Sequence, residues 1–488
     1  MNTQFLVFVS ITAAIAGLTY WQCRGAPRNT DDNAEYFLAG KNLSWYFVAG
    51  SITLTNLSTD QLVGMNGNQM LLLAWWELAA VAGLLILAYV FVPIYYRYDC
   101  TTTTELLEKR YGKQSLRSLV SVLFLLGNVF IYLPIMLYTG SLFLKSMFAL
   151  DASTLTIAFT LAALGSSYAI FGGLRAVAVS DTLSGIGLLL LSLLIVWLSL
   201  NAIKFDFRGI PAERLTMIGD ANSPIPWTTL FTGMLFIQIF YWSTNQTITQ
   251  RAMAAPSVAE AQKGVLAAAG IRLLIVPAII VIPGICAYKL YGDIGDATYG
   301  RLVADLLPGW LSGTFAAMMV AAVLTSFNSV LNSSSTLYVM DLHEPMINPR
   351  ANVRNLNIVV SIVFVGAALS LVPVYDGADS IINLVQQLNG LLSMPILSVF
   401  IVGLVFTNVA AGAAAIALIS GVGLYSVFTF VWTPLHYIHL MAITLLACIS
   451  LALLTNRILF GQRARLSKRL GGELSVETSL KKITESGA

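Results

Sequence analysis

The sequence predicts an all-α integral membrane protein with about thirteen transmembrane helices, on three observations. Of the 488 residues, 57% are hydrophobic and only 10% are charged, whereas ordinary soluble domains carry roughly 25% charged residues. The apolar residues form repeated runs of about the 20 residues that a helix needs to cross a bilayer. The basic residues lie mainly in the short segments between these runs. A soluble core could not bury this much apolar surface, whereas lipid can surround it.

Each span is placed by this length rule. Residues 1–21 lack the basic start and the small-residue cleavage site of a secretory signal, so we expect a retained first span. The predicted spans are 5–22, 45–68, 72–96, 117–147, 154–172, 178–202, 226–250, 264–290, 311–340, 354–373, 379–405, 409–432 and 435–456.

The basic residues predict the orientation, because Lys and Arg are enriched in cytoplasmic segments. With the N-terminus outside, 20 of the 27 basic residues fall in inner segments and six in outer ones, while Arg272 lies within a span. We therefore expect the N-terminus outside and the C-terminus inside, in a bacterial inner membrane. The basic tail 457–488 is expected to lie along the inner lipid surface. The small net charge of +3 makes nucleic acid an unsuitable partner.

Two spans are unusually polar at their centres. Seven polar residues fall between Thr53 and Gln61 in span 45–68, and span 226–250 contains the polar stretch Gln238–Gln246. Such density suits a helix that is broken at mid-membrane, where the freed carbonyl groups can bind a cation. Two interrupted spans at this separation predict an inverted-repeat transporter with its site where they cross.

Span 311–340 carries a third polar group that includes Thr325, Ser326, Asn328 and Ser329. Hydroxyl and amide oxygens are ligands that a small hard cation prefers. Small polar residues also join helices within membrane bundles, so the pattern alone leaves both interpretations open.

Four charged residues lie within predicted transmembrane spans, where contact with lipid is unfavourable: Asp60, Glu77, Asp181 and Arg272. A charge at the bilayer centre costs at least about 2.5–3.5 kcal/mol, so these residues need a partner, a cavity or a ligand. Asp181 has the alternative of capping a helix start near the inner interface.

Several motifs resemble the solute:sodium symporter family, and most closely its sodium/glucose and sodium/galactose cotransporters. They run in order from about residue 36 to 405: YFLAGK (36–41), NLSTDQLVG (56–64), FGGLRAV (171–177), YWSTNQTITQR (241–251) and LNSSST (331–336). The resemblance implies a leucine-transporter-type fold with a five-plus-five inverted repeat. Its segments would be an extra span and linker (1–44), the first repeat (45–202), an outer loop (203–225), the second repeat (226–405), two added spans (406–456) and the tail (457–488).

The resemblance also implies a site. The family's sugar ligands fall on Gln61, Glu77, Gln238, Arg272 and Gln386, with Asn56 and Trp242 nearby. Tyr241 matches the aromatic residue that stacks on the sugar and closes it from the cytoplasm. The main sodium site maps to the carbonyls of Leu54, Leu57 and Ala322 and the hydroxyls of Thr325 and Ser326. A second sodium at Asp181, Asn328 and Ser329 is left open.

The resulting hypothesis is sodium-coupled uptake of a neutral hexose by alternating access. Amides, an acceptor carboxylate and one cationic donor suit the hydroxyls of a sugar. Arg272 stands where the galactose relative has a lysine, and a forked donor could favour an acidic sugar. Glu77 would repel a carboxylate, so a sugar acid, another small organic acid or an amino acid is the alternative. The scattered histidines and cysteines offer no enzyme site, and no obligatory protein partner is indicated.

Overall fold

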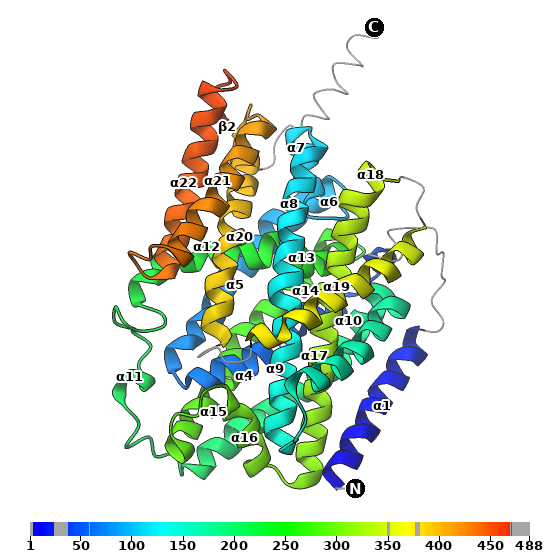
Figure 1. The fold of residues 1–488 in the computed structure, drawn as a ribbon, viewed down its shortest axis with the longest axis vertical. Coiled ribbons are helices and arrows are strands. Elements are labelled where there is room, and N and C mark those ends of the chain that lie inside the picture. The colour runs from blue at the N-terminus through cyan, green and yellow to red at the C-terminus, as the bar shows by residue number, and fades with distance from the viewer. Residues whose placement is uncertain are drawn as a thin grey trace.

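A computed structural model describes residues 3–23, 38–57, 59–348, 352–375, 381–468 and 470, and in these ranges the chain is almost entirely helical (Figure 1). The α-helices are α1 (Thr3–Cys23), α3 (Trp45–Asn56), α4 (Thr59–Asn68), α5 (Trp75–Ile86), α6 (Val92–Arg97), α7 (Glu105–Tyr111), α8 (Gln114–Gly127), α9 (Leu133–Phe148), α10 (Thr154–Ala202), α11 (Ala212–Leu215), α12 (Gly233–Ile239), α13 (Gln246–Met253), α14 (Val258–Leu274), α15 (Val276–Tyr291), α16 (Thr298–Leu306), α17 (Gly309–Leu337), α18 (Glu344–Met346), α19 (Val353–Tyr375), α20 (Ile381–Val405), α21 (Ala411–Phe430) and α22 (Tyr437–Ile458).

Short tighter or wider helical segments join several of these helices. The 3₁₀ segments are η1 (Ala39–Lys41), η2 (Leu71–Ala74), η5 (Trp227–Phe231) and η7 (Gly295–Ala297). The π segments are η3 (Leu87–Phe91), η4 (Asn128–Tyr132), η6 (Phe240–Thr244) and η8 (Tyr338–His343). Wide turns of the π type occur frequently at functional sites, because they turn side chains away from the regular helical position.

Nine helices in the described ranges are long and apolar enough to cross a membrane. They correspond to nine of the thirteen predicted spans. Spans 45–68 and 226–250 are not among them, because each is divided into pieces too short to cross alone. Spans 5–22 and 154–172 correspond to α1 and to the first part of α10, whose described apolar stretches are shorter. The total of thirteen spans stays a prediction.

The predicted break between spans 154–172 and 178–202 is wrong at the level of secondary structure. The structure has one helix, α10, over Thr154–Ala202. The length rule placed two spans here, and the Gly172-Gly173 pair lies between them. Glycine weakens a helix by only about 1 kcal/mol, and no proline lies in this segment to remove a hydrogen bond.

Both predicted helix interruptions are confirmed. The first span divides into α3 and α4 at Leu57, whose backbone leaves the helical region (φ −80°, ψ 77°). The second divides at Asn245, which is extended (φ −70°, ψ 123°). The Asn245 side chain accepts a hydrogen bond from the Thr247 backbone N–H at 2.9 Å, so the same residue ends η6 and caps α13.

The connecting segments gather at the two ends of the molecule (Figure 1). Helices α7 and α18 lie at one end with β2, and α11 and α16 lie toward the other. Strand β2 (Arg465–Leu466) pairs antiparallel with β1 (Phe406–Thr407). The membrane topology and the side that is cytoplasmic stay predictions, and the tail after 470 lies outside the described residues.

Candidate functional site

A cavity lies between the two interrupted helices, with space of about 50 Å³ for water-sized molecules. Seven of the eight residues predicted to bind solute line it: Asn56, Gln61, Glu77, Gln238, Tyr241, Trp242 and Gln386. The other lining residues are Asp60, Met65, Trp76, Tyr132, Ile237, Ile382, Val385 and Asn389. This volume holds only a few waters, so a larger solute requires the surrounding side chains to move apart.

The eighth residue, Arg272, lies behind the cavity wall and is fully buried. Its guanidinium forms an ion pair with Glu77, which is 1% exposed, and also donates to the side-chain oxygen of Asn56. It donates further to the Thr53 carbonyl at 3.2 Å, and its Cζ lies 4.4 Å from the Trp242 ring centroid. Arg272 therefore neutralises the charge of Glu77 and positions Asn56 and Trp242, all three of which line the cavity.

Gln61 connects this ion pair to the cavity. Its Nε2 donates to Glu77 Oε1 at 2.5 Å. Its Oε1 is buried and has no hydrogen-bond donor within the described residues. A buried amide oxygen without a donor costs about 1–3 kcal/mol, so Gln61 presents an acceptor that a solute hydroxyl could satisfy.

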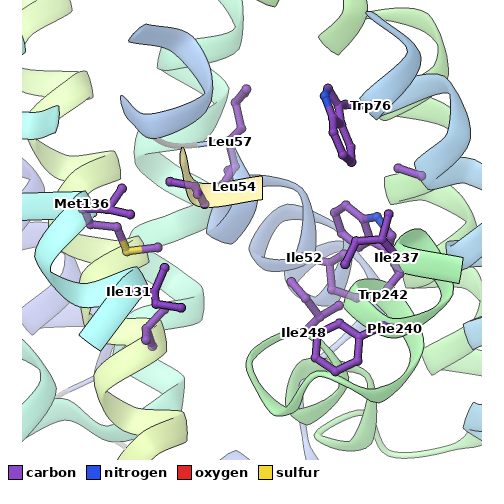
Figure 2. Packing of buried hydrophobic residues seen from close by; sticks show 14 of the residues in the cluster. Ile52, Leu54, Leu57, Trp76, Ile131, Met136, Ile237, Phe240, Trp242 and Ile248 are labelled. Carbon is purple, nitrogen blue, oxygen red and sulfur yellow. The ribbon is translucent and has the colours of Figure 1, made fainter. Parts of the chain in front are cut away.

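Aromatic side chains and amides form another part of the wall. Tyr241 and Trp242 meet edge to face with their ring centroids 5.2 Å apart. The Tyr241 hydroxyl accepts a hydrogen bond from Asn56 Nδ2 at 2.8 Å. Gln238 accepts from Trp242 Nε1 and donates to the Trp76 carbonyl, both at 2.9 Å. Figure 2 shows the indole rings of Trp76 and Trp242 among the buried apolar residues. The hydrogen bond from Nε1 to Gln238 fixes the orientation of the Trp242 ring.

Sequence reasoning missed Tyr132 and Asn389. The Tyr132 hydroxyl donates to Asn389 Oδ1 at 2.5 Å, and Asn389 Nδ2 donates to Gln386 Oε1 at 3.4 Å. The spacing of Gln386 and Asn389, three residues apart on one face of an apolar span, is a signal that could have identified Asn389. Tyr132 ends the π segment η4, and nothing in its local sequence marks it.

A loop carboxylate anchors the start of the helix that carries Gln386. Asp296, in η7, accepts a hydrogen bond from the Ile381 backbone N–H at 3.2 Å. Burial raises the pKa of Asp296 to about 6. The contact occupies one of the backbone donors that the first turn of α20 leaves unpaired.

The predicted main sodium ligands meet where α3 ends against α17. Ser326 Oγ donates to the Leu54 carbonyl at 3.3 Å, and Thr325 Oγ1 donates to the Ala322 carbonyl at 3.1 Å. All four residues are at most 3% exposed. Figure 2 shows Leu54 and Leu57 at the interruption. These buried neutral oxygens form the donor set that a hard cation prefers.

The possible second sodium site is described only in part. Asn328 is buried, and its Oδ1 has no hydrogen-bond donor within the described residues. Ser329 Oγ donates to the Thr325 carbonyl at 2.7 Å. The side chain of Asp181 lies outside the described residues, so the second sodium site stays a prediction, with Asn328 and Ser329 as neighbours on α17.

Comparison with known proteins gives a consistent result. The model of the sodium:solute symporter family matches residues 36–421. The chain is 35% identical to the uncharacterized symporter YidK of Escherichia coli (strain K12), over 91% of this chain and 82% of that one. It is 29% identical to the sodium/glucose cotransporter of Vibrio parahaemolyticus, over 90% and 88% of the two chains.

Solved structures share the fold. A Na⁺-coupled sialic acid symporter, in a substrate-bound outward-open state, matches with a TM-score of 0.81 and 18% identity, over 96% of this chain and 99% of that one. The nucleobase-cation-symport-1 family transporter Mhp1 matches with a TM-score of 0.54 and 14% identity, over 85% and 92%. These neighbours have the leucine-transporter fold that the motifs imply. The chain is a transporter, not an enzyme, and belongs to the sodium:solute symporter family.

Proposed function

We propose that this protein couples sodium entry to the uptake of a neutral hexose, such as glucose or galactose. The observation that carries the proposal is the cavity lining: amide groups, aromatic rings and a carboxylate surround one space between two interrupted helices. A hexose hydroxyl both donates and accepts hydrogen bonds, so it can bind the vacant Gln61 oxygen and an amide N–H group. The glucose cotransporter of Vibrio parahaemolyticus supports a sugar as the solute.

The charge of the cavity supports a neutral solute over an acidic one. Arg272 is the cation that could have favoured a sugar acid, but its guanidinium already binds Glu77, Asn56 and the Thr53 carbonyl. Among the described lining residues no basic side chain faces the cavity. An anionic solute would lose hydration without gaining a counter-charge, which is costly in a buried site. Among the described lining residues, no contact specifically supports a sugar acid, another small organic acid or an amino acid as the solute.

The proposed mechanism is alternating access in the inner membrane of a bacterium. Sodium is a co-transported substrate, held by the carbonyls of Leu54, Leu57 and Ala322 and the hydroxyls of Thr325 and Ser326. In the structure the Ser326 hydroxyl bonds the Leu54 carbonyl directly. Sodium would replace this bond and join α3 to α17, which favours the arrangement that admits solute.

Sodium release would then loosen the closed site. Once the ion leaves, α3 and its Asn56 can shift, and the hydrogen bond from Asn56 to the Tyr241 hydroxyl can break. Tyr241 would then swing aside and let the solute leave. A second sodium at Asp181, Asn328 and Ser329 remains part of the proposal, supported by the vacant Asn328 oxygen.

A competition assay tests the solute class. Purified protein in proteoliposomes, with an inward sodium gradient, should take up labelled glucose or galactose. Unlabelled neutral hexoses in excess should suppress this uptake, because they offer the hydroxyls that the amides bind, while sugar acids and amino acids should not. Uptake that a sugar acid or an amino acid blocks and that hexoses leave unchanged would contradict the proposal.

A pair of glutamine variants provides the control. Gln61→Ala removes an amide that lines the cavity, and should lower the apparent affinity for hexose about tenfold, the loss expected for one good hydrogen bond. Gln262→Ala removes an amide that instead donates to the Ala88 carbonyl at 3.0 Å, away from the cavity, and should leave the affinity within twofold.

A further inference from the structure

A second cavity lies beside the solute cavity, and the motifs imply no function for it. It has space of about 20 Å³, which is enough for about one water molecule. Tyr132 and Asn389 line both cavities, and the Tyr132 hydroxyl donates a hydrogen bond to Asn389 Oδ1. This hydrogen bond therefore lies at the boundary between the two spaces.

The second cavity contains an unsatisfied polar group. Ser393 lies on α20, about one turn beyond Asn389, and is fully buried. A serine in a helix commonly donates to a preceding backbone carbonyl, as Ser398 Oγ does to the Pro395 carbonyl at 2.6 Å. Ser393 Oγ instead has no hydrogen-bond partner within the described residues, which costs about 1–3 kcal/mol for a buried group. Its hydroxyl is therefore available to a hydroxyl-bearing molecule that enters the cavity.

The rest of the lining is of the same chemical type as that of the solute cavity. Asn128, Asn245 and Asn389 contribute amides. Phe124 and Phe240 contribute rings that stack with their centroids 5.9 Å apart. No charged residue of the described part of the chain lines this cavity. Amides and a hydroxyl can bind the hydroxyl groups of a neutral solute, but they offer no counter-charge to an ion.

The second cavity lies where the proposed mechanism requires a route. The segments η4, η6 and α20 each line both cavities. Along α20 the lining passes from Ile382 in the solute cavity to Ile396 in the second one, in the direction of β1. Strand β1 pairs with β2 of the basic tail, which is expected on the inner side. Movement of Tyr241 in η6 would therefore join the solute cavity to a space that lies toward that side.

We propose that the second cavity is a holding site for a neutral solute that has left the solute cavity. Breaking the hydrogen bond between Tyr132 and Asn389 opens the entrance, and the Ser393 hydroxyl and the amides then bind hydroxyl groups of the solute. Space for one water molecule is too small for a sugar, so η4 and η6 move apart when the solute enters. This inference rests on the proposed transport of a hydroxylated solute and adds the step that follows its release.

An introduced thiol tests whether the second cavity opens. Ser393→Cys places a side chain of similar size in the cavity, and Ser398→Cys, on the same helix and outside both cavities, is the control. Both variants are purified in detergent and treated with a water-soluble maleimide, and the unsubstituted protein gives the background of its own four cysteines.

A buried thiol reacts only when it becomes accessible. We expect the thiol at position 393 to react about tenfold faster without sodium than with it, because sodium release loosens the closed site. The control thiol should react at the background rate in both conditions. Equal rates at position 393 with and without sodium, or no reaction in either, would overturn the proposal.

Uptake by the labelled protein tests whether the solute passes through the cavity. The maleimide is attached after folding, so the result does not depend on whether a bulky substitution folds. After reconstitution, labelled Ser393→Cys should lose sodium-driven uptake, whereas Ser398→Cys treated in the same way should retain it. Equilibrium binding of the solute in sodium should stay within about twofold, because position 393 does not line the solute cavity.

Two outcomes of the uptake measurement would contradict the holding site. Uptake at the unlabelled rate would mean that the cavity holds only water. Loss of solute binding together with uptake would place the effect of the label in the solute cavity instead.

The design separates this inference from the proposed function. The labelling rates are measured without solute, so they test the opening of the cavity even if the protein carries no hexose. The uptake measurement then uses the solute that the competition assay identifies, and a block by the label supports the holding site for that solute.

Discussion

Substituting either Glu77 or Arg272 alone should destabilise the protein and abolish uptake. Arg272 is fully buried and Glu77 is 1% exposed, and they form an ion pair. Loss of one partner leaves an uncompensated buried charge, which costs roughly 3–5 kcal/mol. We therefore expect Glu77→Gln and Arg272→Gln to lower the free energy of unfolding by about that amount, measured by thermal unfolding of the purified protein in detergent.

The double variant Glu77→Gln, Arg272→Gln separates stability from function. Two neutral amides leave no buried charge, so part of the lost stability should return, and the double-mutant cycle should give a coupling free energy of about 1–3 kcal/mol. Uptake should stay absent, because the acceptor carboxylate of Glu77 that lines the cavity is gone and Gln61 also loses the group that holds it. The exposed Glu213 provides the control: Glu213→Gln should change the stability by less than about 0.5 kcal/mol. Single variants as stable as this control would contradict the account.

Asp341→Asn should be nearly as damaging, although Asp341 lies outside the solute cavity. The Asp341 carboxylate is fully buried in η8. It accepts hydrogen bonds from Arg117 Nε at 2.8 Å and Nη2 at 2.6 Å, from Thr102 at 3.0 Å, and from the hydroxyls of Thr104 and Ser121. An amide cannot accept all of these bonds, and Arg117 loses a charged partner. We expect a loss of about 3–5 kcal/mol in the free energy of unfolding.

The same substitution should also reduce uptake, because the Asp341 network reaches the second interrupted helix. The loop that contains Thr102 and Thr104 also contains Thr103, whose backbone N–H donates to Gln246 Oε1 at 2.8 Å, at the start of α13. Thermal unfolding and hexose uptake are measured together. Asp305→Asn is the matched control: Asp305 lies 3.8 Å from Arg301 and is half exposed, so its loss should cost less than about 1 kcal/mol. If Asp341→Asn lost no more stability and no more uptake than Asp305→Asn, the role given to the Asp341 network would be wrong.

The sequence predicted the two helix interruptions because their signal is local. Polar residues concentrate within a few positions of Leu57 and Asn245, and lipid tolerates such density only where the backbone faces a cavity or protein. The family resemblance, rather than this local signal, implied seven of the fifteen residues that line the cavity. The pairing of Glu77 with Arg272 was not predictable, because 195 residues separate them and neither local segment indicates which opposite charge it will meet.

Asp341 and Arg117 escaped the sequence analysis for a different reason. The predicted span 311–340 ended one residue before Asp341, and Arg117 stood at the very start of the predicted span 117–147, where it was counted with the basic residues of the inner side. The helical structure instead continues through η8 to His343, so both charges are buried within the helix bundle. Hydropathy locates the end of an apolar run in the sequence. A helix can continue beyond that end where its polar residues pair with other groups inside the protein. The π segments that carry Tyr132, Tyr241 and Asp341 likewise have no sequence signature.

The dependence of hexose uptake on sodium tests the central claim most directly. A tenfold inward sodium gradient contributes about 1.4 kcal/mol and a potential of 100 mV, negative inside, contributes about 2.3 kcal/mol. Together they allow one sodium ion to concentrate a neutral solute on the order of several-hundred-fold. Ser326→Ala should raise the sodium concentration needed for half-maximal uptake about tenfold, whereas Ser312→Ala, at a buried serine near the start of α17, should not. The account predicts accumulation in sodium and none when potassium replaces it; equal uptake in the two ions would contradict it.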